Sequence, residues 1–375
     1  MLPIRSFMHQ GRIWEKGPPS RSFTAPATAE LASFIDAILP VGRVAAGPGG
    51  AAVEPRPGPA RHNQGGTRVG AAKPYTGVFP IAPTPFTASG ELDIEGQRRV
   101  LDCMVAQAVD GICILANYSE QFLLSDEERD TLLEVCLAHV NGRVPVIVTC
   151  SHFSTRIAAD RARRAAAAGA AMVMLMPPYH GVGLRADEAM MLQHFARVAE
   201  ASRVPIMIQD APLSGVTLSV PFLVRLAREV PAVRYFKIEM PGTAAKLRSL
   251  IAAAADAIEG PFDGEEAITL MADLDAGATG TMPSALLPDL IKGVFTLHRA
   301  GRRQEAAAAY ARLLPLINYE NRQCGLRATK TVMAAGGVIR SDAVRHPLEP
   351  LQPATRAGLL ELAREADPLA LRWGR

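Results

Sequence analysis

Short apolar runs alternate with helix-like stretches along most of the chain. From Tyr75 onward, eight runs rich in Val, Ile and Met recur, at residues 77–86, 111–116, 144–150, 172–177, 205–210, 234–239, 257–262 and 277–284. Stretches of Ala, Leu, Arg and Glu at helical spacing separate them, at residues 94–107, 125–140, 155–168, 186–201, 220–229 and 243–254. Strands that alternate with helices predict a parallel sheet, and eight such units favour a (β/α)8 TIM barrel.

A doubly wound sheet is the alternative fold. No GxGxxG fingerprint follows the first apolar run, which counts against a dinucleotide-binding domain. After the eighth run the pattern becomes helical throughout, at residues 287–300, 303–317, 325–335 and 353–365. The pattern therefore predicts a barrel over residues 75–285 and a C-terminal helical extension over residues 286–375.

Residues 1–74 differ in composition from the rest of the chain. Pro, Gly, Ser and Arg dominate, and only residues 29–39 have the spacing of a short helix with an apolar face. This composition predicts a mostly disordered leader. The segment has no continuous apolar stretch next to a basic start, so a secretory signal is not predicted; a transit peptide and an over-extended start codon are the open alternatives.

Charge and cysteine content argue against several classes of function. Residues 1–74 carry nine Lys or Arg against four Asp or Glu, which leaves 31 against 33 in the remainder of the chain. A near-neutral folded part argues against nucleic-acid binding, and the longest apolar run, residues 165–178, is too short to span a membrane. Five scattered cysteines without a CxxC pair are typical of reduced thiols in the cytoplasm. Cys136 and His139 lack further ligands nearby, so no metal is predicted.

A lysine interrupts the sixth apolar run, Arg234-Tyr235-Phe236-Lys237-Ile238-Glu239. Strands covered on both faces are usually unbroken apolar runs, and burying an ammonium group is costly unless it is paired or deprotonated. Burial lowers a lysine pKa from about 10.4 toward neutrality, which leaves an amine that can form a Schiff base with a ketone. The alternative is a lysine at a strand end whose ammonium reaches water or a carboxylate.

Other polar residues gather at the predicted carboxyl ends of the strands, where barrels of this type carry their reactive side chains. Lys237 and Glu239 are two positions apart, so both should face the interior of the barrel, where they can supply a nucleophile and a proton carrier. The alternative role for Glu239 is a salt bridge that keeps Lys237 charged. The remaining residues at these ends are Asn117, Tyr118, Ser119, Glu120, Pro177, Pro178, Tyr179, His180, Gln209, Asp210, Asp263, Gly264, Glu265 and Glu266.

Several of these strings occur in an order that resembles the dihydrodipicolinate synthase / N-acetylneuraminate lyase family of class I aldolase-type barrels. They are residues 116–120 (ANYSE), residues 177–179 (PPY), Lys237 and residues 277–280 (GATG), and the resemblance covers residues 75–317, more loosely the helices beyond. It implies that Lys237 forms a Schiff base with a 2-keto acid and that residues 116–120 bind the substrate carboxylate. Asn117 and Tyr118 replace the hydroxyl pair that is usual in this loop.

A larger departure from the family follows the fifth strand. Gln209 occupies the position where most members have a catalytic tyrosine, and a glutamine cannot shuttle a proton, which argues against the ordinary synthase or lyase mechanism. Residues 115–121, 207–212, 260–266 and 318–324 instead resemble the branch of the family that dehydrates L-2-keto-3-deoxyarabonate to 2-oxoglutarate semialdehyde, in the nonphosphorylative breakdown of pentoses such as L-arabinose.

The resemblance to this branch implies a hydro-lyase that needs no metal or other cofactor. We assign the Schiff base to Lys237 and acid/base work to Glu239, with Tyr179 as a second candidate proton relay or, equally, an aromatic plug at a strand end. Tyr118, Ser119 and nearby amides would hold the carboxylate, and Gln209 would bind the substrate hydroxyls. The full set of predicted substrate-binding residues is Asn117, Tyr118, Ser119, Glu120, Gln209, Asp210, Gly264 and Glu265.

Two other functions remain open at this point. An aldolase on the same fold would cleave a 2-keto-3-deoxy sugar acid to pyruvate and an aldehyde, and a catalytically silent barrel would only bind a sugar acid. The predicted partner in each case is a small 2-keto-3-deoxy sugar acid. The family resemblance also implies a homotetramer.

Overall fold

The structure is a computed structural model that describes residues 5–9, 12–17, 73–180 and 183–375. The chain divides into two compact units, residues 1–69 and 70–375. In the first unit, β1 (Arg5–His9) pairs antiparallel with β2 (Arg12–Gly17). The helix expected at residues 29–39 lies outside the described residues, and the disorder expected of the leader stays a prediction.

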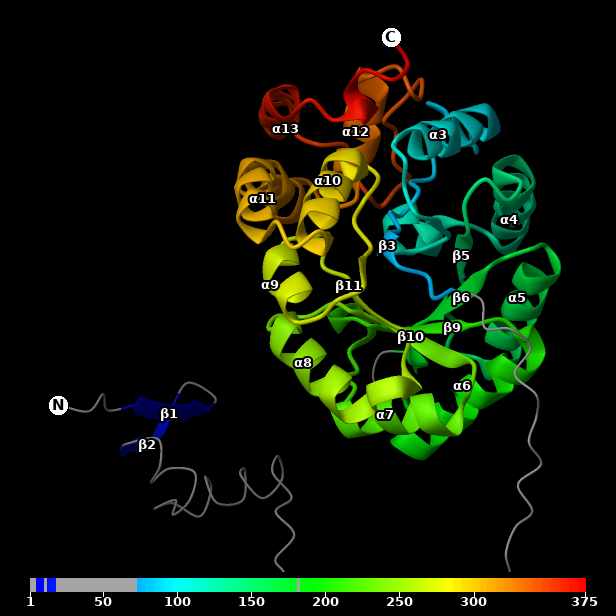
Figure 1. Cartoon of the computed structure of the whole chain (residues 1–375), viewed down its shortest axis with the longest axis vertical. Helices are drawn as coiled ribbons and strands as arrows, with labels where there is room; N and C mark the ends of the chain where they lie inside the picture. Colours follow the sequence, from blue (N-terminus) through cyan, green and yellow to red (C-terminus); the bar gives the residue numbers. More distant parts are fainter. Residues whose placement is uncertain (1–4, 10–11, 18–72, 181–182) are drawn as a thin grey trace, which may run out of the picture. The chain divides into compact units, whose positions relative to one another are not determined.

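The second unit is built around eight parallel strands, and each of the eight predicted runs overlaps one (Figure 1). The order around the sheet is β3 (Gly77–Val78), β12 (Gly280–Thr281), β11 (Gly260–Asp263), β10 (Val233–Ile238), β9 (Ile206–Asp210), β6 (Met172–Leu175), β5 (Val146–Thr149) and β4 (Ile112–Ile114). The chain beyond β3 closes the sheet, because Cys113 N donates to Pro80 O (2.9 Å) and Ala82 N donates to Cys113 O (2.8 Å). The (β/α)8 prediction is confirmed.

Helices follow the strands in turn and cover the outside of the sheet (Figure 1). They are α3 (Ile94–Ala106), α4 (Asp126–Val140), α5 (Thr155–Ala167), α6 (Glu188–Ser202), α7 (Val220–Glu229), α8 (Thr243–Ala254), α9 (Leu270–Asp275) and α10 (Pro288–Arg299). Ser125 begins α4 with a capping box, since its hydroxyl accepts from Glu128 N (3.2 Å) and Glu128 Oε2 accepts from Ser125 N (3.0 Å). The short α9 is not evident from the sequence pattern.

Period-two alternation along each strand separates two hydrophobic cores. Phe236 and Ile238 of β10 face the helices, whereas Tyr235 lies in the barrel interior with Phe79 and Phe262. The rings of Phe79 and Phe262 are 5.6 Å apart between centroids, and those of Tyr235 and Phe262 are 6.2 Å apart. Each fully buried aromatic side chain contributes about 1.5–3 kcal/mol of transfer free energy. The lower barrel is thus a packed core, which leaves its carboxyl end for chemistry.

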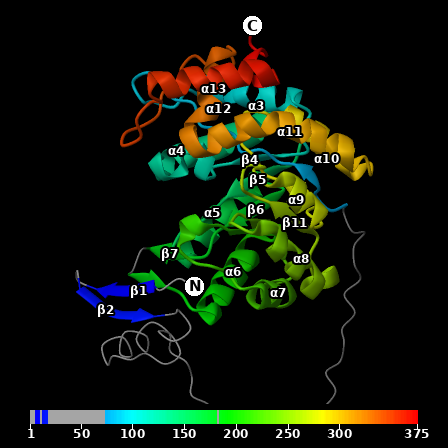
Figure 2. The ribbon, with the colours of Figure 1, turned by 90° about the vertical axis from the view of Figure 1, so that its left-hand side faces the viewer.

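Three further helices follow the barrel in the C-terminal part of the chain: α11 (Arg303–Tyr319), α12 (Arg327–Ala335) and α13 (Pro353–Ala366). Figures 1 and 2 show α12 and α13 lying near α3 and α11, and Arg99 of α3 donates to Val338 O (2.8 Å) just after α12. Between α11 and α12 the chain forms a π-helical segment, Glu320–Cys324. Such segments occur frequently at functional sites.

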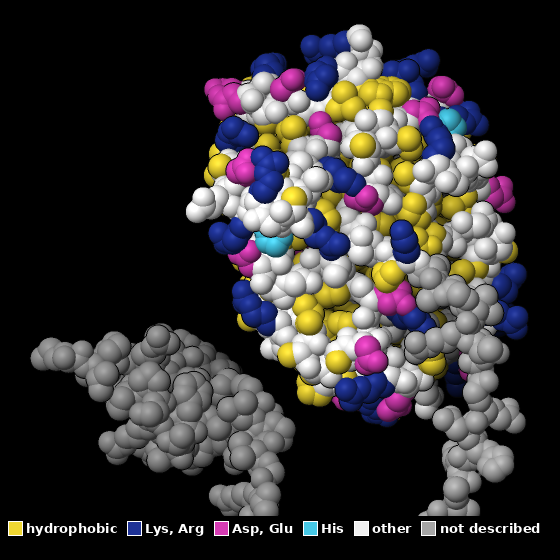
Figure 3. Space-filling view, viewed as in Figure 1, with side chains coloured by type: hydrophobic (Ala, Val, Ile, Leu, Met, Phe, Trp, Pro, Cys, Tyr) yellow, Lys and Arg dark blue, Asp and Glu magenta, His cyan; other side chains and the backbone are white. Residues whose placement is uncertain are grey.

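The surface of the second unit is mixed in charge. On the face drawn in Figure 3, basic and acidic side chains are interspersed. Among the helices in the described part of the chain, none combines the length and the hydropathy that crossing a bilayer requires.

Candidate active site

Lys237 stands inside the barrel, one layer above Tyr235. It is paired in register with Gln209 of β9 and Phe262 of β11, and its side chain is 1% exposed. Its Nζ lies 3.1 Å from Glu239 Oε2, and Gln209 Nε2 donates to the same oxygen (2.9 Å). The structure therefore brings together a lysine, a glutamate and a glutamine at the carboxyl ends of β9 and β10.

A net lowering of the Lys237 pKa is not found, and the structure has the alternative, a lysine paired with a carboxylate. Burial does act in that direction, but nearby acidic groups, the carboxylate of Glu239 first among them, outweigh it, and the pKa of Lys237 is raised above its ordinary value. In the ligand-free protein Lys237 is an ammonium ion. Its proton must leave before the nitrogen can attack a ketone, and Glu239 Oε2 at 3.1 Å is the nearest acceptor that the structure provides.

Gly264, directly after β11, packs against the stem of Lys237. A Cβ at this position would lie 2.6 Å from Lys237 Cγ, 2.9 Å from Lys237 Cε and 3.1 Å from Glu239 Cβ. The absence of a side chain at Gly264 makes room for Lys237 and Glu239, and its predicted role in substrate binding stays a prediction.

We expect Gly264→Ala to lower turnover by about 10²-fold, because a side-chain displacement of about 1 Å at a reacting group costs that much. Borohydride trapping of a bound 2-keto acid should slow in parallel, and both rates are read by mass spectrometry and product assay. Gly293→Ala in α10 is the control, since a Cβ there meets nothing within 4 Å. Equal turnover in the two variants would contradict the packing argument.

The loop after β4 places Tyr118 beside this centre. Tyr118 packs against the interior core, and burial together with nearby acidic groups raises its pKa, so that its hydroxyl stays a hydrogen-bond donor. Asn117, half-buried in the same loop, accepts from Gln121 Nε2 (3.1 Å) through Oδ1 and places Nδ2 3.9 Å from Met176 Sδ.

Ser119 does not have the predicted role. Its hydroxyl donates to Ala82 O (2.6 Å) and accepts from Ala116 N (3.1 Å), and its carbonyl accepts from Thr84 Oγ1 (2.7 Å). The side chain is 1% exposed and its single donor is used inside the protein. Ser119 holds the loop in shape, and it has no proton left to donate to a substrate carboxylate.

Glu120 and Asp210 are also placed away from the substrate side. Glu120 is completely buried and pairs with Lys330 of α12. Asp210 lies on the outer face of β9, where Oδ2 is 2.5 Å from Lys246 Nζ of α8 and Oδ1 accepts from Leu218 N (3.3 Å). Gln209 and Asp210 are neighbours in sequence, so they face opposite sides of the sheet, and only Gln209 faces the interior.

Tyr179 belongs to a separate cavity. It lies on β7 (Tyr179–His180), which forms a hairpin with β8 (Leu184–Arg185). The cavity of about 430 Å³ beside it contains neither Lys237 nor Glu239. Tyr179 lines this cavity and Lys237 does not, so the role of Tyr179 as a proton relay stays a prediction. The lining residues are Gln121, Phe122, Leu124, Arg129, Ser151, His152, Phe153, Arg161, Met176, Pro177, Tyr179 and His180.

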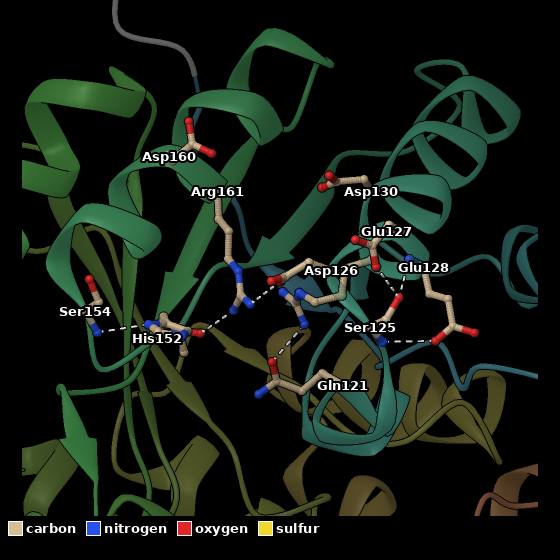
Figure 4. A network of polar contacts seen from close by, with 12 residues as sticks. Gln121, Ser125, Asp126, Glu127, Glu128, Asp130, His152, Ser154, Asp160 and Arg161 are labelled. Carbon is tan, nitrogen blue, oxygen red and sulfur yellow. Dashed lines mark hydrogen bonds and ion pairs between the residues drawn. The ribbon is translucent and has the colours of Figure 1, made fainter.

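Two arginines give this cavity its polar wall. Figure 4 shows Arg161 reaching from α5 toward Asp126 at the start of α4, where the two side chains are 2.8 Å apart. Arg129 donates to Gln121 Oε1 (2.9 Å) and to Thr149 O (2.9 Å). Gln121 also donates to Asn117, so hydrogen bonds connect the wall of this cavity to the loop that carries Tyr118.

Three acidic residues complete the region. Glu265 is half-buried, with an oxygen 3.9 Å from Arg322 Nη2. Glu266 and Glu320 are almost fully buried; Glu266 lies near both Lys237 and Tyr118, and Glu320 lies near Tyr118. Sequence reasoning did not assign either of them a role, although both lie in strings that carried the resemblance. Among the described residues, no group of three or more His, Cys, Asp or Glu is arranged to hold a metal ion.

Comparison with known proteins agrees with this architecture. Residues 74–366 match the model of the Dihydrodipicolinate synthetase family. The chain belongs to this family. Among family relatives, an L-2-keto-3-deoxyarabonate dehydratase of Azospirillum brasilense is 56% identical over 299 residues, which is 80% of this chain and 97% of the relative. A 4-hydroxy-tetrahydrodipicolinate synthase of Kineococcus radiotolerans is 30% identical over 76% of this chain and 92% of its own length.

Solved structures of the family have the same fold. A putative dihydrodipicolinate synthetase from Pseudomonas aeruginosa superposes with a TM-score of 0.73 at 29% identity, covering 78% of this chain and 99% of its own. A prophage protein of the dihydrodipicolinic acid synthase family from E. coli K12, solved in complex with pyruvate, gives a TM-score of 0.73 at 25% identity with the same coverage.

Proposed function

We propose that this protein is a class I, Schiff-base hydro-lyase that converts L-2-keto-3-deoxyarabonate to 2-oxoglutarate semialdehyde and water. The observation that carries the proposal is the pair formed by the buried Lys237 and the partly exposed Glu239, whose atoms are 3.1 Å apart, together with Gln209 on the neighbouring strand. The 56% identity to an L-2-keto-3-deoxyarabonate dehydratase supports the choice of substrate.

The first step forms the Schiff base. Glu239 accepts the ammonium proton of Lys237, and the freed nitrogen attacks the C2 ketone. The proton then passes to the carbinolamine oxygen, which leaves as water, so that Glu239 is again a carboxylate. The resulting iminium at C2 withdraws electrons and acidifies C3.

The second step is the elimination. Glu239 removes a C3 proton, the electron pair forms an enamine, and the enamine expels the C4 hydroxyl with a proton as water. Asn117 and Tyr118 hold the substrate carboxylate from the loop after β4. Gln209 binds a substrate hydroxyl through Oε1, a buried atom that has no hydrogen-bond partner among the described residues.

Gln209 favours dehydration over cleavage between C3 and C4. Cleavage to pyruvate needs a group that takes the proton of the C4 hydroxyl, and an amide cannot do this. The assay is direct: purified protein and L-2-keto-3-deoxyarabonate are mixed, and products are identified by mass. Semialdehyde without pyruvate supports the dehydratase, pyruvate release supports an aldolase, and failure of borohydride to trap any 2-keto acid supports a silent barrel.

For Glu239→Gln we expect turnover to fall by about 10²–10⁴-fold, because proton transfer by a positioned side chain contributes that much. Trapping should slow as well, since the ammonium of Lys237 loses its acceptor. Glu259→Gln is a matched control, because Glu259 accepts from the Tyr235 hydroxyl (2.7 Å) just before β11, at the opposite end of the barrel. If Glu239→Gln keeps near wild-type turnover, its role in proton transfer must be given up.

We further propose that the protein acts as a homotetramer in the cytoplasm. All five cysteines are buried and none forms a disulfide, which is compatible with a reducing compartment. Light scattering of the purified protein tests the assembly, and a monomer at micromolar concentration would contradict it.

A further inference from the structure

Glu266 is a buried carboxyl group that the mechanism above does not use. It is 5% exposed, and its Oε1 has no hydrogen-bond partner among the described residues. It follows Gly264, which touches both Lys237 and Glu239, by two positions. The charges of Glu239, Lys237 and Glu320 all act on it. An unpaired carboxyl oxygen in such a place needs an explanation, because a buried polar atom without a partner has lost its bonds to water and gained none in return.

The backbone around Glu266 is strained. Glu266 and Ala267 have φ values of 45° and 65°, in the left-handed region that residues with a side chain rarely adopt. Two such residues in succession are energetically unfavourable. Strain of this kind persists where surrounding structure enforces it, and it is concentrated at functional sites. Here it accompanies a glutamate that stays buried while the preceding Glu265 is half-exposed to solvent.

The charge of the site also calls for a neutral acid. Glu239 and Glu266 lie close to Lys237, Glu320 lies close to Glu266, and the proposed substrate is itself an anion. Burial, reinforced by the charge of Glu239, raises the pKa of Glu266 well above its ordinary value, and burial raises the pKa of Glu320 to about 7. With Glu266 in its neutral form, the substrate meets one carboxylate fewer and one additional proton donor.

We propose that Glu266 is the catalytic acid that protonates the C4 hydroxyl as it leaves. This inference rests on the proposed dehydration. Glu239 and Glu266 then divide the work, as pairs of carboxyl groups in different environments do in other enzymes. The C3–H bond breaks toward Glu239, a C3–C4 double bond forms, and the C4–O bond breaks with the oxygen taking the proton of Glu266 and leaving as water.

The same assignment returns both groups to their starting forms. After elimination Glu239 holds the C3 proton and Glu266 is a carboxylate next to the chain C3=C4–C5. Glu266 removes a proton from C5, and Glu239 returns its proton to C3, which moves the double bond to C4=C5. The product is an enol that becomes the semialdehyde after hydrolysis of the Schiff base, and no oxidant, reductant or metal is consumed.

The test separates the two proton transfers. Wild type, Glu266→Gln and Glu239→Gln are each given L-2-keto-3-deoxyarabonate in deuterated water, and C3 exchange and semialdehyde formation are followed by NMR. For Glu266→Gln we expect exchange at near the wild-type rate and product formation reduced by about 10²–10⁴-fold. For Glu239→Gln exchange and product formation should fall together. Borohydride trapping with pyruvate, retained in Glu266→Gln, shows that this variant is folded.

A second substrate distinguishes acid catalysis from a structural role. The 4-deoxy-4-fluoro analogue loses fluoride, which needs little protonation, so Glu266→Gln should release fluoride within about threefold of wild type. Equal losses with both substrates would overturn the inference, as would semialdehyde formation by Glu266→Gln within threefold of wild type. If wild type traps pyruvate but forms no semialdehyde, the proposed function fails and the inference falls with it.

Discussion

Lys237→Ala is expected to abolish both borohydride trapping and dehydration, with turnover reduced by about 10⁴-fold or more. In the proposed mechanism only the Lys237 amine converts the substrate ketone to an iminium. Removing a covalent nucleophile usually leaves only the contribution of substrate binding and positioning to the rate. Trapping is measured as the mass increase of the intact protein after reduction with pyruvate. Turnover is measured as semialdehyde formed.

Two further variants make this result interpretable. Lys237→Met keeps the volume that packs against Gly264, so a folded protein without trapping isolates the loss of the amine from the loss of packing. Lys246→Met removes a second partly buried lysine, which pairs with Asp210 outside the barrel interior. It should retain trapping. A Lys237→Met protein that still gains the reduced adduct would place the Schiff base on another lysine and remove the basis of the proposed chemistry.

Lys330→Met is expected to lower the free energy of unfolding by about 3–5 kcal/mol, because it leaves the carboxylate of Glu120 buried without its counter-ion. Both side chains of this pair are 0% exposed. The ammonium also donates to Ala343 O (2.7 Å) and Thr84 O (3.3 Å), and it lies 4.6 Å from the centre of the Phe86 ring. The pair ties α12 to the loop that carries Tyr118, so substrate binding should weaken as well.

The destabilisation of Lys330→Met should depend on pH in a defined direction. Burial already raises the pKa of Glu120 despite the attraction of Lys330 and Arg345, and losing the ammonium raises it further. The carboxyl group of Glu120 then has a higher pKa in the folded protein than in the unfolded one. At a pH between these two pKa values the folded protein binds more protons than the unfolded protein, so stability falls as the pH rises. The free energy of unfolding that Lys330→Met loses relative to wild type should therefore be smaller at pH 5 than at pH 8. Urea unfolding of both proteins at the two pH values measures this loss.

Matched variants in the same extension test the buried-charge argument. Arg356→Met breaks an ion pair with Asp342 in which both side chains are about 40% exposed, and it should cost only about 0–1 kcal/mol. The double variant Glu120→Gln/Lys330→Met should recover part of the loss, because no buried charge remains. If Lys330→Met unfolds at the same urea concentration as wild type at pH 8, the pair does not stabilise the fold.

The alternation of apolar and polar residues determined the architecture of the barrel by itself. Eight apolar runs separated by helical stretches leave few arrangements that bury every strand on both faces. The same period of two placed Lys237 inside the barrel and, two positions on, Glu239 beside it. One lysine within an apolar strand is a strong indication of a functional residue, because the neighbouring residues give no reason for a charged side chain there.

Only the tertiary structure decided which polar residues reach the lysine and in which protonation state. Asp210 follows Gln209 in sequence but faces outward, and Glu120 finds its partner Lys330 in a helix far along the chain. The pKa of Lys237 rises despite its burial, chiefly because the carboxylate of Glu239 lies 3.1 Å from its nitrogen. Loop conformation, long-range pairing and the sum of nearby charges depend on distances in space, and a linear pattern contains no such distances.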